Sequence, residues 1–309
     1  MSELLTVTTI GEDPLDYLRQ QGTVVAEFGR LTQDSGNVSW LVDVANRRLF
    51  VKTAGVDGPP APGATVPYFD HEGRVRLLRN AIDLAHSCHH PALPRLLNVI
   101  ESPAGPALVY EAAEGELVGV ARGDRDDPAS AYKRFAHLPA DQLLGVFDVL
   151  IDLHVALAAA GWVACDLYDG CLIINFATAS LTVIDLDSYR RGLSANDMGR
   201  MFGSTRFMGP EEFELGAVID ERTTLFTLGR FVWHFGTRLT ERAEDFCGSP
   251  AVAQVVQHAC QASPADRHPS VAVFAEAWRT ARDLPRKGSV DQSWVLSNER
   301  NAGWRTGQV

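Results

Sequence analysis

The sequence predicts an α+β protein of two lobes, in which a small antiparallel β-rich N-terminal lobe precedes a larger, mainly helical C-terminal lobe. Short segments rich in β-branched and aromatic residues fill the first third of the chain, whereas residues 210–283 show helical patterns. Between them, Leu143 to Ala160 is apolar on most faces, which predicts a central helix. A length of 309 residues suits two such units. The expected organisation is an N-terminal segment at 1–22, the N-lobe at 23–114, the C-lobe at 115–285, and a tail at 286–309 that is either disordered or docked.

The composition is that of an ordinary globular protein. Hydrophobic residues make up 46% and charged residues 22%, which excludes collagen-like, coiled-coil and mainly disordered chains. Because 39 acidic residues face 28 basic ones, the net charge is -11. We therefore do not expect nucleic acid as the main partner, and an anionic membrane surface is disfavoured.

The N-terminal sequence does not fit a signal peptide, and both this feature and the pattern of cysteines indicate a cytoplasmic protein. The N-terminus has acidic residues where a signal peptide needs a basic start, and the most apolar stretch, Leu143 to Val163, is interrupted by Asp148, Asp152 and His154. Five scattered cysteines without a C-x-x-C pair argue against a disulfide framework or a structural zinc site, and they fit a reducing compartment. We expect a cytoplasmic protein without a membrane span.

The N-lobe is expected to combine several strands with one helix. A hairpin turn is expected at residues 45–47, and the Gly- and Pro-rich stretch 54–67 is expected to form a loop. Apolar residues at spacings of three and four predict a helix from Arg74 to Cys88. The expected strands are Thr23–Phe28, Val38–Val44, Arg48–Thr53, Leu96–Ile100 and Ala107–Glu111.

Two features of this lobe are candidate phosphate-binding elements. Lys52 closes an apolar strand, where a charged ammonium is costly unless an anion meets it. It is either a phosphate-binding lysine or an edge lysine that extends to solvent. The loop from Gly29 to Val38, which contains Gly36, is either a cradle of backbone N–H groups for phosphate or an ordinary hairpin loop.

Acidic residues follow the central helix in two places. Asp166 lies in a loop before a predicted β-hairpin formed by Leu172–Phe176 and Leu181–Ile184. Asp185 and Asp187 end the second of these strands, where burial of an unpaired charge would cost several kcal/mol. In an extended segment they point the same way, as two oxygen ligands for Mg²⁺ would. The alternative is a pair of solvated turn aspartates.

The order of these parts resembles the eukaryotic-type protein kinase superfamily, in the form found in bacterial serine/threonine kinases. The resemblance covers roughly residues 20–283. The matching segments are Lys52, His90-Pro91-Ala92-Leu93, Leu108 to Gly115, Asp166, Asp185-Leu186-Asp187, Gly203 to Glu211, Asp220 to Gly229, and Asp266 to Ser270.

The resemblance implies an ATP site between the lobes, with Mg²⁺ or Mn²⁺. Lys52 is implied to hold the α- and β-phosphates, Asp185 with Asp187 to hold the metal, and Asp166 to accept the proton of the attacking hydroxyl. The remaining nucleotide-binding positions implied by the family are Gly29, Gly36 and Val38 over the phosphates, Tyr110 as gatekeeper, and the Glu111 carbonyl and Ala113 amide facing adenine. In the C-lobe, the same resemblance implies an ion pair between Arg267 and Glu211.

The catalytic loop departs from the family pattern. Ala164 and Cys165 replace the His-Arg before the catalytic aspartate, so the usual receiver for an activation-loop phosphate is missing. Tyr168 occupies the position of a lysine in the family. Cys171 occupies the position of a metal-binding asparagine, and a neutral thiol is a poor ligand for a hard cation. Asp169 or Asn175 is a candidate to replace the lost group.

Further departures concern the neighbours of Lys52 and the central C-lobe helix. Asp187 occupies the glycine of the Asp-Phe-Gly segment and is a candidate for a replacement metal oxygen, and Thr224 replaces an aspartate. The helix glutamate that should pair with Lys52 is missing. Asn80 or Ala81 occupies that turn, and Glu72 lies about two turns too early.

These observations predict ATP-dependent phosphoryl transfer to a Ser or Thr hydroxyl of a protein substrate, by a serine/threonine kinase-like enzyme with a divergent site. The segment from Gly203 to Glu211 favours a protein substrate, because in the resembled family it forms the platform for a peptide. Two alternatives stay open: a catalytically weak or inactive pseudokinase that acts as a scaffold for a signalling partner, and a small-molecule phosphotransferase of the aminoglycoside or choline kinase type. The sequence does not indicate an oligomeric state.

Overall fold

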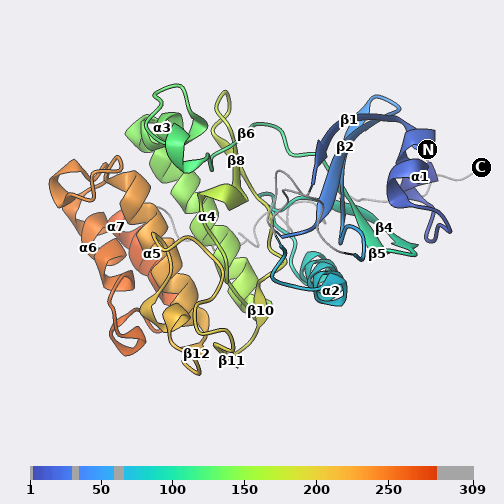
Figure 1. Ribbon diagram of the computed structural model, residues 1–309. Helices are drawn as coiled ribbons and strands as arrows, with labels where there is room; N and C mark the ends of the chain where they lie inside the picture. Colours follow the sequence, from blue (N-terminus) through green and yellow to red (C-terminus); the bar gives the residue numbers. More distant parts are fainter. Residues whose placement is uncertain (1–2, 30–34, 59–65, 284–309) are drawn as a thin grey trace, which may run out of the picture.

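The computed structural model describes residues 3–29, 35–58 and 66–283, and it has an α+β fold with a small antiparallel sheet and a larger helical part (Figure 1). The predicted tail at 286–309 lies outside the described residues, as do residues 30–34 and 59–65. The sheet has five strands in the order β1-β2-β3-β5-β4, and every neighbouring pair is antiparallel. The strands are β1 (Thr23–Phe28), β2 (Val38–Val44), β3 (Arg47–Thr53), β4 (Leu96–Ser102) and β5 (Gly105–Glu111).

The tight turn between β2 and β3 is confirmed. Ala45 and Asn46 have φ angles of 47° and 66°, the left-handed pair that a two-residue hairpin of the I′ type requires. This turn fixes the register in which Ser39 lies opposite Lys52 and Val38 lies opposite Thr53. The register decides which residues face the helical part.

The N-terminal segment is an integral part of the sheet region. It contains η1 (Glu3–Leu5) and α1 (Pro14–Gln21), and α1 begins with an Asp13 cap followed by proline. Leu4, Tyr17 and Leu18 are buried against sheet residues such as Trp40. The segment at 1–22 that the sequence sets apart therefore covers one face of the sheet in its described residues.

Helix α2 (His71–Ser87) lies against the opposite face of the sheet (Figure 1). It begins three residues earlier than its apolar spacing predicts, because the Asp70 side chain accepts a hydrogen bond from the Gly73 amide and caps it. Arg74 is buried in the first turn and donates to the carbonyls of Ala54, Val56 and Phe69. These bonds attach the loop after β3 to the helix.

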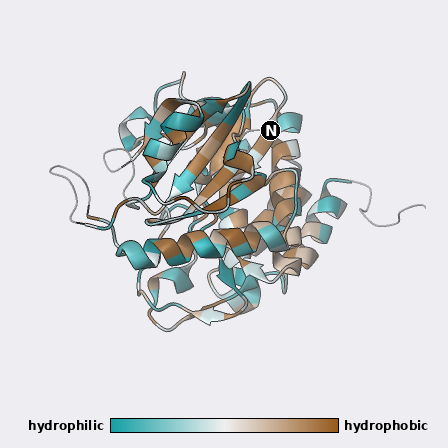
Figure 2. Cartoon of the chain, turned by 90° about the vertical axis from the view of Figure 1, so that its right-hand side faces the viewer, coloured by the Kyte–Doolittle hydropathy of each residue, from teal (hydrophilic) through white to brown (hydrophobic). Residues whose placement is uncertain are grey.

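The helical part surrounds α4 (Ala140–Ala159), as the sequence predicts. The other helices are α3 (Ala131–Ala136), α5 (Glu221–Gly236), α6 (Pro250–Ala259) and α7 (Val271–Ala281). Helix α4 contacts α5, α7 and β9 (Ser180–Val183), and its core includes Phe147, Phe231 and Trp278. Figure 2 shows hydrophobic residues concentrated on the strands and helices inside the molecule. Although α4 is apolar and long enough to cross a membrane, half of its apolar window (50%) is buried in the protein, which is consistent with a core helix.

Short strands and turns connect the two parts. The predicted β8–β9 hairpin is confirmed, and β6 extends it to three strands. The remaining elements are β6 (Glu116–Leu117), β7 (Trp162–Val163), β8 (Leu172–Asn175), β10 (Arg190–Arg191), β11 (Ser194–Ala195), β12 (Val218–Ile219), η2 (Arg122–Asp124), η3 (Asp169–Cys171), η4 (Pro210–Phe213), η5 (Ala243–Asp245) and η6 (Pro264–Asp266). The segment from β5 to β6 is the connection between the sheet and the helices.

Candidate functional site

A cavity of about 1830 Å³ lies between the sheet and the helical part. Its walls come from three regions: Phe28, Ser39, Leu41, Phe50 and Lys52 of the sheet; Tyr110, Glu111, Ala113 and Leu117 of the connection; and Asp166, Ile173, Ile184, Asp185 and Asp187 of the helical part. Such a concave site with apolar walls and a few convergent charges is typical of a ligand-binding cleft.

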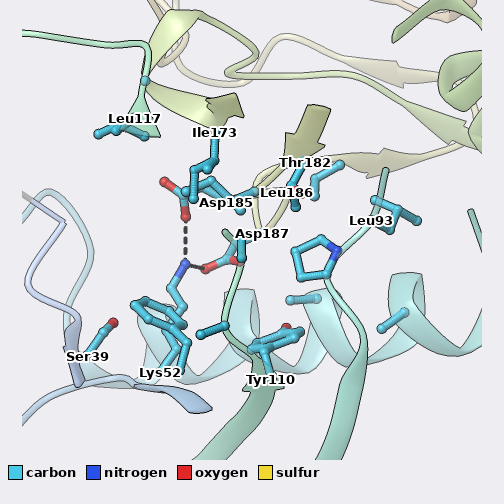
Figure 3. Close-up of a pocket in the computed structure, with 18 of the residues that line it drawn as sticks. Ser39, Lys52, Leu93, Tyr110, Leu117, Ile173, Thr182, Asp185, Leu186 and Asp187 are labelled. Carbon is cyan, nitrogen blue, oxygen red and sulfur yellow. Dashed lines mark hydrogen bonds and ion pairs between the residues drawn. The ribbon is translucent and has the colours of Figure 1, made fainter. Parts of the chain in front are cut away.

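Lys52 and the two strand-end aspartates meet in this cavity (Figure 3). The Lys52 Nζ atom lies 2.6 Å from Asp185 Oδ1 and 2.5 Å from Asp187 Oδ2. The Lys52 and Asp187 side chains are 12% and 10% exposed, whereas that of Asp185 is 50% exposed. The expectation that Asp185 and Asp187 point the same way is confirmed, and the edge-lysine and solvated-turn alternatives do not describe this arrangement.

The charges of this cluster stabilise one another. Burial alone would lower the pKa of Lys52, but the two carboxylates outweigh it and raise that pKa above its usual value. Lys52 in turn lowers the pKa of Asp185. Burial raises the pKa of Asp187, against the attraction of Lys52. The ammonium is therefore held in its charged form, as a group that binds phosphate must be.

Asp166 and Asp185 are among the non-glycine residues with a left-handed backbone conformation. Asp166 and Asp185 each have a φ angle of 62°, in the left-handed region that non-glycine residues rarely adopt. Strained backbone of this kind costs about 1–3 kcal/mol per residue and concentrates at functional sites. Both residues line the same cavity.

Helix α5 supports the loop that carries Asp166. The Ala164 amide donates to Thr224 Oγ1 over 2.9 Å, and both residues are buried. On the other side, the Cys171 thiol donates to the Asp166 carbonyl at 3.3 Å. Burial raises the pKa of Cys171 well above its usual value, so its sulfur stays protonated and neutral. This agrees with the prediction that Cys171 is a poor metal ligand.

Hydrogen bonds engage the side chains of the two other candidates for a replacement metal oxygen. Asp169 is buried, and its Oδ1 atom accepts a hydrogen bond of 2.5 Å from Arg206 Nη2. Asn175 ends β8, outside the residues that line the cavity, and its side-chain oxygen caps the Ala177 amide. Each side chain thus has one oxygen in a hydrogen bond, although Asp169 also lines the cavity.

Val38, which the resemblance assigns to the nucleotide site, does not line the cavity. Cross-strand partners share a face, so Ser39 and Lys52 face the cavity while Val38 faces the opposite side. Val38 packs against the apolar cluster beneath the N-terminal segment. The Ser39 hydroxyl is buried beside Lys52 and has no hydrogen-bond partner among the described residues.

The glycines of the β1–β2 loop do not line the cavity in the described structure. Ser35 contributes to the wall, whereas Gly29 and Gly36 do not. Gly36 has a φ angle of 79° and lies against Pro67, where an added Cβ atom would come within 2.5 Å of its Cγ. Because residues 30–34 lie outside the described part, the phosphate-cradle prediction stays a prediction.

The connection contributes the residues expected at its end of the cavity. Tyr110, Glu111 and Ala113 all line it, and the Glu111 side chain turns outward to Arg47 at 3.2 Å. Phe28 and Phe50, which sequence reasoning missed, form an aromatic pair with ring centroids 6.1 Å apart. The available signal was the spacing of Phe50, two residues before Lys52 on the same face of the strand.

In the turn of α2 where the resembled family has a glutamate, Asn80 bonds the backbone that follows Asp185. Asn80 Nδ2 donates to the carbonyls of Asp187 (2.8 Å) and Tyr189 (2.7 Å). Glu72 instead pairs with exposed Arg76 one turn further along the helix. The ion-pair partners that the structure gives Lys52 are Asp185 and Asp187.

Asp185 is the residue of this cavity that could hold a divalent cation together with a phosphate ligand. Among the described residues, no group of three or more His, Cys, Asp or Glu side chains is placed to hold a metal by itself. Mg²⁺ commonly binds through one or two carboxylates together with substrate phosphates. Half-exposed Asp185 is suited to that role. No protein-family model matches the chain, and no curated protein sequence matches it.

Proposed function

We propose that the protein is a divergent protein-kinase-like phosphotransferase that transfers a phosphoryl group from ATP to a Ser or Thr hydroxyl of a protein. The observation that carries the proposal is the convergence of Lys52, Asp185 and Asp166 on one cavity. A buried cation, a half-exposed carboxylate and a second carboxylate are the groups that phosphoryl transfer needs for charge neutralisation and positioning.

Each residue has a separate task in this proposal. Lys52 would bind the α- and β-phosphates, and Asp185 is the residue that would hold Mg²⁺. The bound metal would neutralise charge on the phosphates. Asp166 accepts the proton of the incoming hydroxyl, and Thr224 supports its loop through the Ala164 amide. Tyr110, Glu111 and Ala113 border the base. The five free cysteines suit a reducing compartment, and the proposal places the protein in the cytoplasm.

A second candidate is a pseudokinase, and it is favoured by two observations. Cys171 presents a neutral thiol where the resembled family has a metal ligand, and Phe50 occupies the sheet face beside the base end of the cavity. A scaffold of this kind would bind a signalling partner without transferring phosphate.

The deciding experiment is incubation of the full chain with radiolabelled ATP, in Mg²⁺ and in Mn²⁺ separately. We expect labelling of a generic protein substrate by the wild type and none by Lys52→Met or Asp185→Ala. The exposed Asp83→Ala variant on α2 is the control. Labelling of an aminoglycoside panel instead would indicate a small-molecule phosphotransferase.

Nucleotide binding separates an enzyme from an inert scaffold when transfer is not seen. A ligand at one hundred times its dissociation constant adds about 2.7 kcal/mol to the free energy of unfolding. MgATP is therefore expected to raise the melting temperature of the wild type but not of Asp185→Ala. An unchanged melting temperature of the wild type would contradict ATP binding, and ATP turnover by Asp185→Ala would contradict the metal assignment.

A further inference from the structure

We propose that Asp187 is the fixed counter-ion of Lys52 and that Asn80 positions Asp187. This division leaves Asp185 free to bind the metal. This inference rests on the proposed function and assigns the binding of Lys52 and the binding of the metal to different residues. It replaces the expectation that both aspartates are metal ligands. Asp187 acts through Lys52 and is therefore a positioning residue.

The two aspartates differ in burial although both contact the same ammonium. The Asp187 side chain is 10% exposed and lies 2.5 Å from Lys52 Nζ, whereas the Asp185 side chain is 50% exposed at 2.6 Å. A carboxylate that already faces the open cavity can leave Lys52 and bind a metal more easily than a buried one. A buried carboxylate that lost Lys52 would be left as an uncompensated charge, which is strongly unfavourable.

Asn80 fixes the backbone that carries Asp187. Both hydrogens of its Nδ2 group are used, one by the Asp187 carbonyl at 2.8 Å and one by the Tyr189 carbonyl at 2.7 Å. These carbonyls lie two residues apart, so the amide holds an entire turn of chain against α2. The helix thus controls the position of Lys52 indirectly, through an amide and a separate carboxylate.

The arrangement explains how Lys52 keeps a partner when ligand binds. In the structure, the Lys52 ammonium contacts both carboxylates. When Asp185 turns to a metal, Asp187 remains to hold the ammonium at the same place. Without Asp187, the Lys52 ammonium would lose the buried partner that holds it when Asp185 turns to a metal.

The first test uses the free protein and needs no nucleotide. Urea midpoints are measured for wild type, Lys52→Met, Asp187→Asn and the double variant, which form a double-mutant cycle. We expect the double variant to unfold at a midpoint no lower than that of the less stable single variant. If Asp187→Asn does not fold but the double variant does, this also shows coupling between Lys52 and Asp187, and the coupling is then larger. Additive midpoint shifts would overturn the counter-ion assignment.

The same cycle tests Asn80. In an Asn80→Ala background we expect the coupling between Lys52 and Asp187 to fall to half or less, whereas the exposed Asp83→Ala variant on the same helix leaves it unchanged. A merely structural role for Asn80 would lower every midpoint equally. Unchanged coupling in Asn80→Ala would overturn the positioning role.

The second test separates the two aspartates by their metal requirement. The Mg²⁺ concentration that gives half of the ATP-dependent thermal shift is measured for Asp185→Asn, Asp187→Asn and Asp187→Glu. We expect Asp185→Asn to raise it at least about tenfold, and both Asp187 variants to stay within about threefold of wild type. Equal increases in Asp185→Asn and Asp187→Asn would show that Asp187 is a metal ligand. A wild type without any ATP shift would contradict the proposed function, while the urea cycles would still decide the counter-ion assignment.

Discussion

Arg267 and Glu211 form a buried ion pair with two parallel hydrogen bonds, from Arg267 Nη1 to Glu211 Oε1 at 2.6 Å and from Nη2 to Oε2 at 2.9 Å. Their side chains are 0% and 6% exposed. The guanidinium also donates to the carbonyls of Gln261, Arg222 and Ala262. The pair thus joins η4, the start of α5 and the segment before α7, and the predicted contact between these two residues is confirmed.

Loss of the Glu211 charge is expected to destabilise the protein strongly. Glu211→Gln leaves the Arg267 guanidinium buried without its anion, and such a break costs about 3–5 kcal/mol. Asp16→Asn is the control, because it breaks an exposed pair with Arg19 and should cost less than about 1 kcal/mol. Urea denaturation measures both. Equal, small losses in the two variants would show that burial of the pair does not matter.

Local sequence patterns predicted the elements that carry the site. Strand propensity located β1, β2 and β3, and the apolar spacing located α2 and α4. In β2, β3, α2 and α4 these patterns coincide with buried faces, so tertiary packing reinforces them.

The orientation of side chains was harder to predict than the elements. Val38 was placed one residue away from the position that faces the cavity, because a shift of one residue in a strand exchanges its two faces. The partners of Asp169 and Asn80 were not predictable, since Arg206 and the Tyr189 carbonyl lie far away in sequence. Long-range hydrogen bonds leave no periodic pattern in a chain.

The face assignment of β2 gives a second prediction. Ser39→Leu adds volume beside Lys52 and should abolish the MgATP-dependent rise in melting temperature. Val38→Ala removes apolar packing on the other face, so it should lower stability by about 1–3 kcal/mol but keep the MgATP effect. Differential scanning fluorimetry with and without MgATP distinguishes them. The reverse pattern would place Val38 in the cavity.

Thr224 should be needed for the conformation of the loop before Asp166. Thr224→Val keeps the shape but leaves the buried Ala164 amide without its acceptor, which costs about 1–3 kcal/mol. Thr224→Ser retains the hydroxyl and should lose less than about 1 kcal/mol. The urea midpoint of each variant measures its stability. The rate of phosphate transfer shows whether Asp166 is still correctly placed. A Val variant as stable and active as the Ser variant would rule out this support.

His154 is expected to contribute stability that is lost in mild acid. This histidine is buried in α4, where Nδ1 bonds the Leu150 carbonyl at 2.8 Å and Nε2 bonds the Tyr189 hydroxyl at 2.9 Å. Leu150 offers only an acceptor, so Nδ1 carries the proton of the neutral ring and Nε2 accepts from Tyr189. Burial lowers the pKa of His154 from 6.5 to about 4.

The direction of the effect follows from the lowered pKa. Below pH 6.5 the unfolded chain binds a proton at His154, while the folded protein does not until about pH 4, so stability present above pH 6.5 is lost as the pH falls through this window. The full loss is about 3 kcal/mol. Burial raises the pKa of Glu212 to about 8, which acts in the opposite direction, so the test must compare two proteins that share Glu212. Urea unfolding from pH 7 to pH 4.5 should weaken the wild type by about 2–3 kcal/mol more than His154→Gln, whose amide replaces both hydrogen bonds without titrating. Identical pH dependence of the two proteins would contradict a neutral, buried His154.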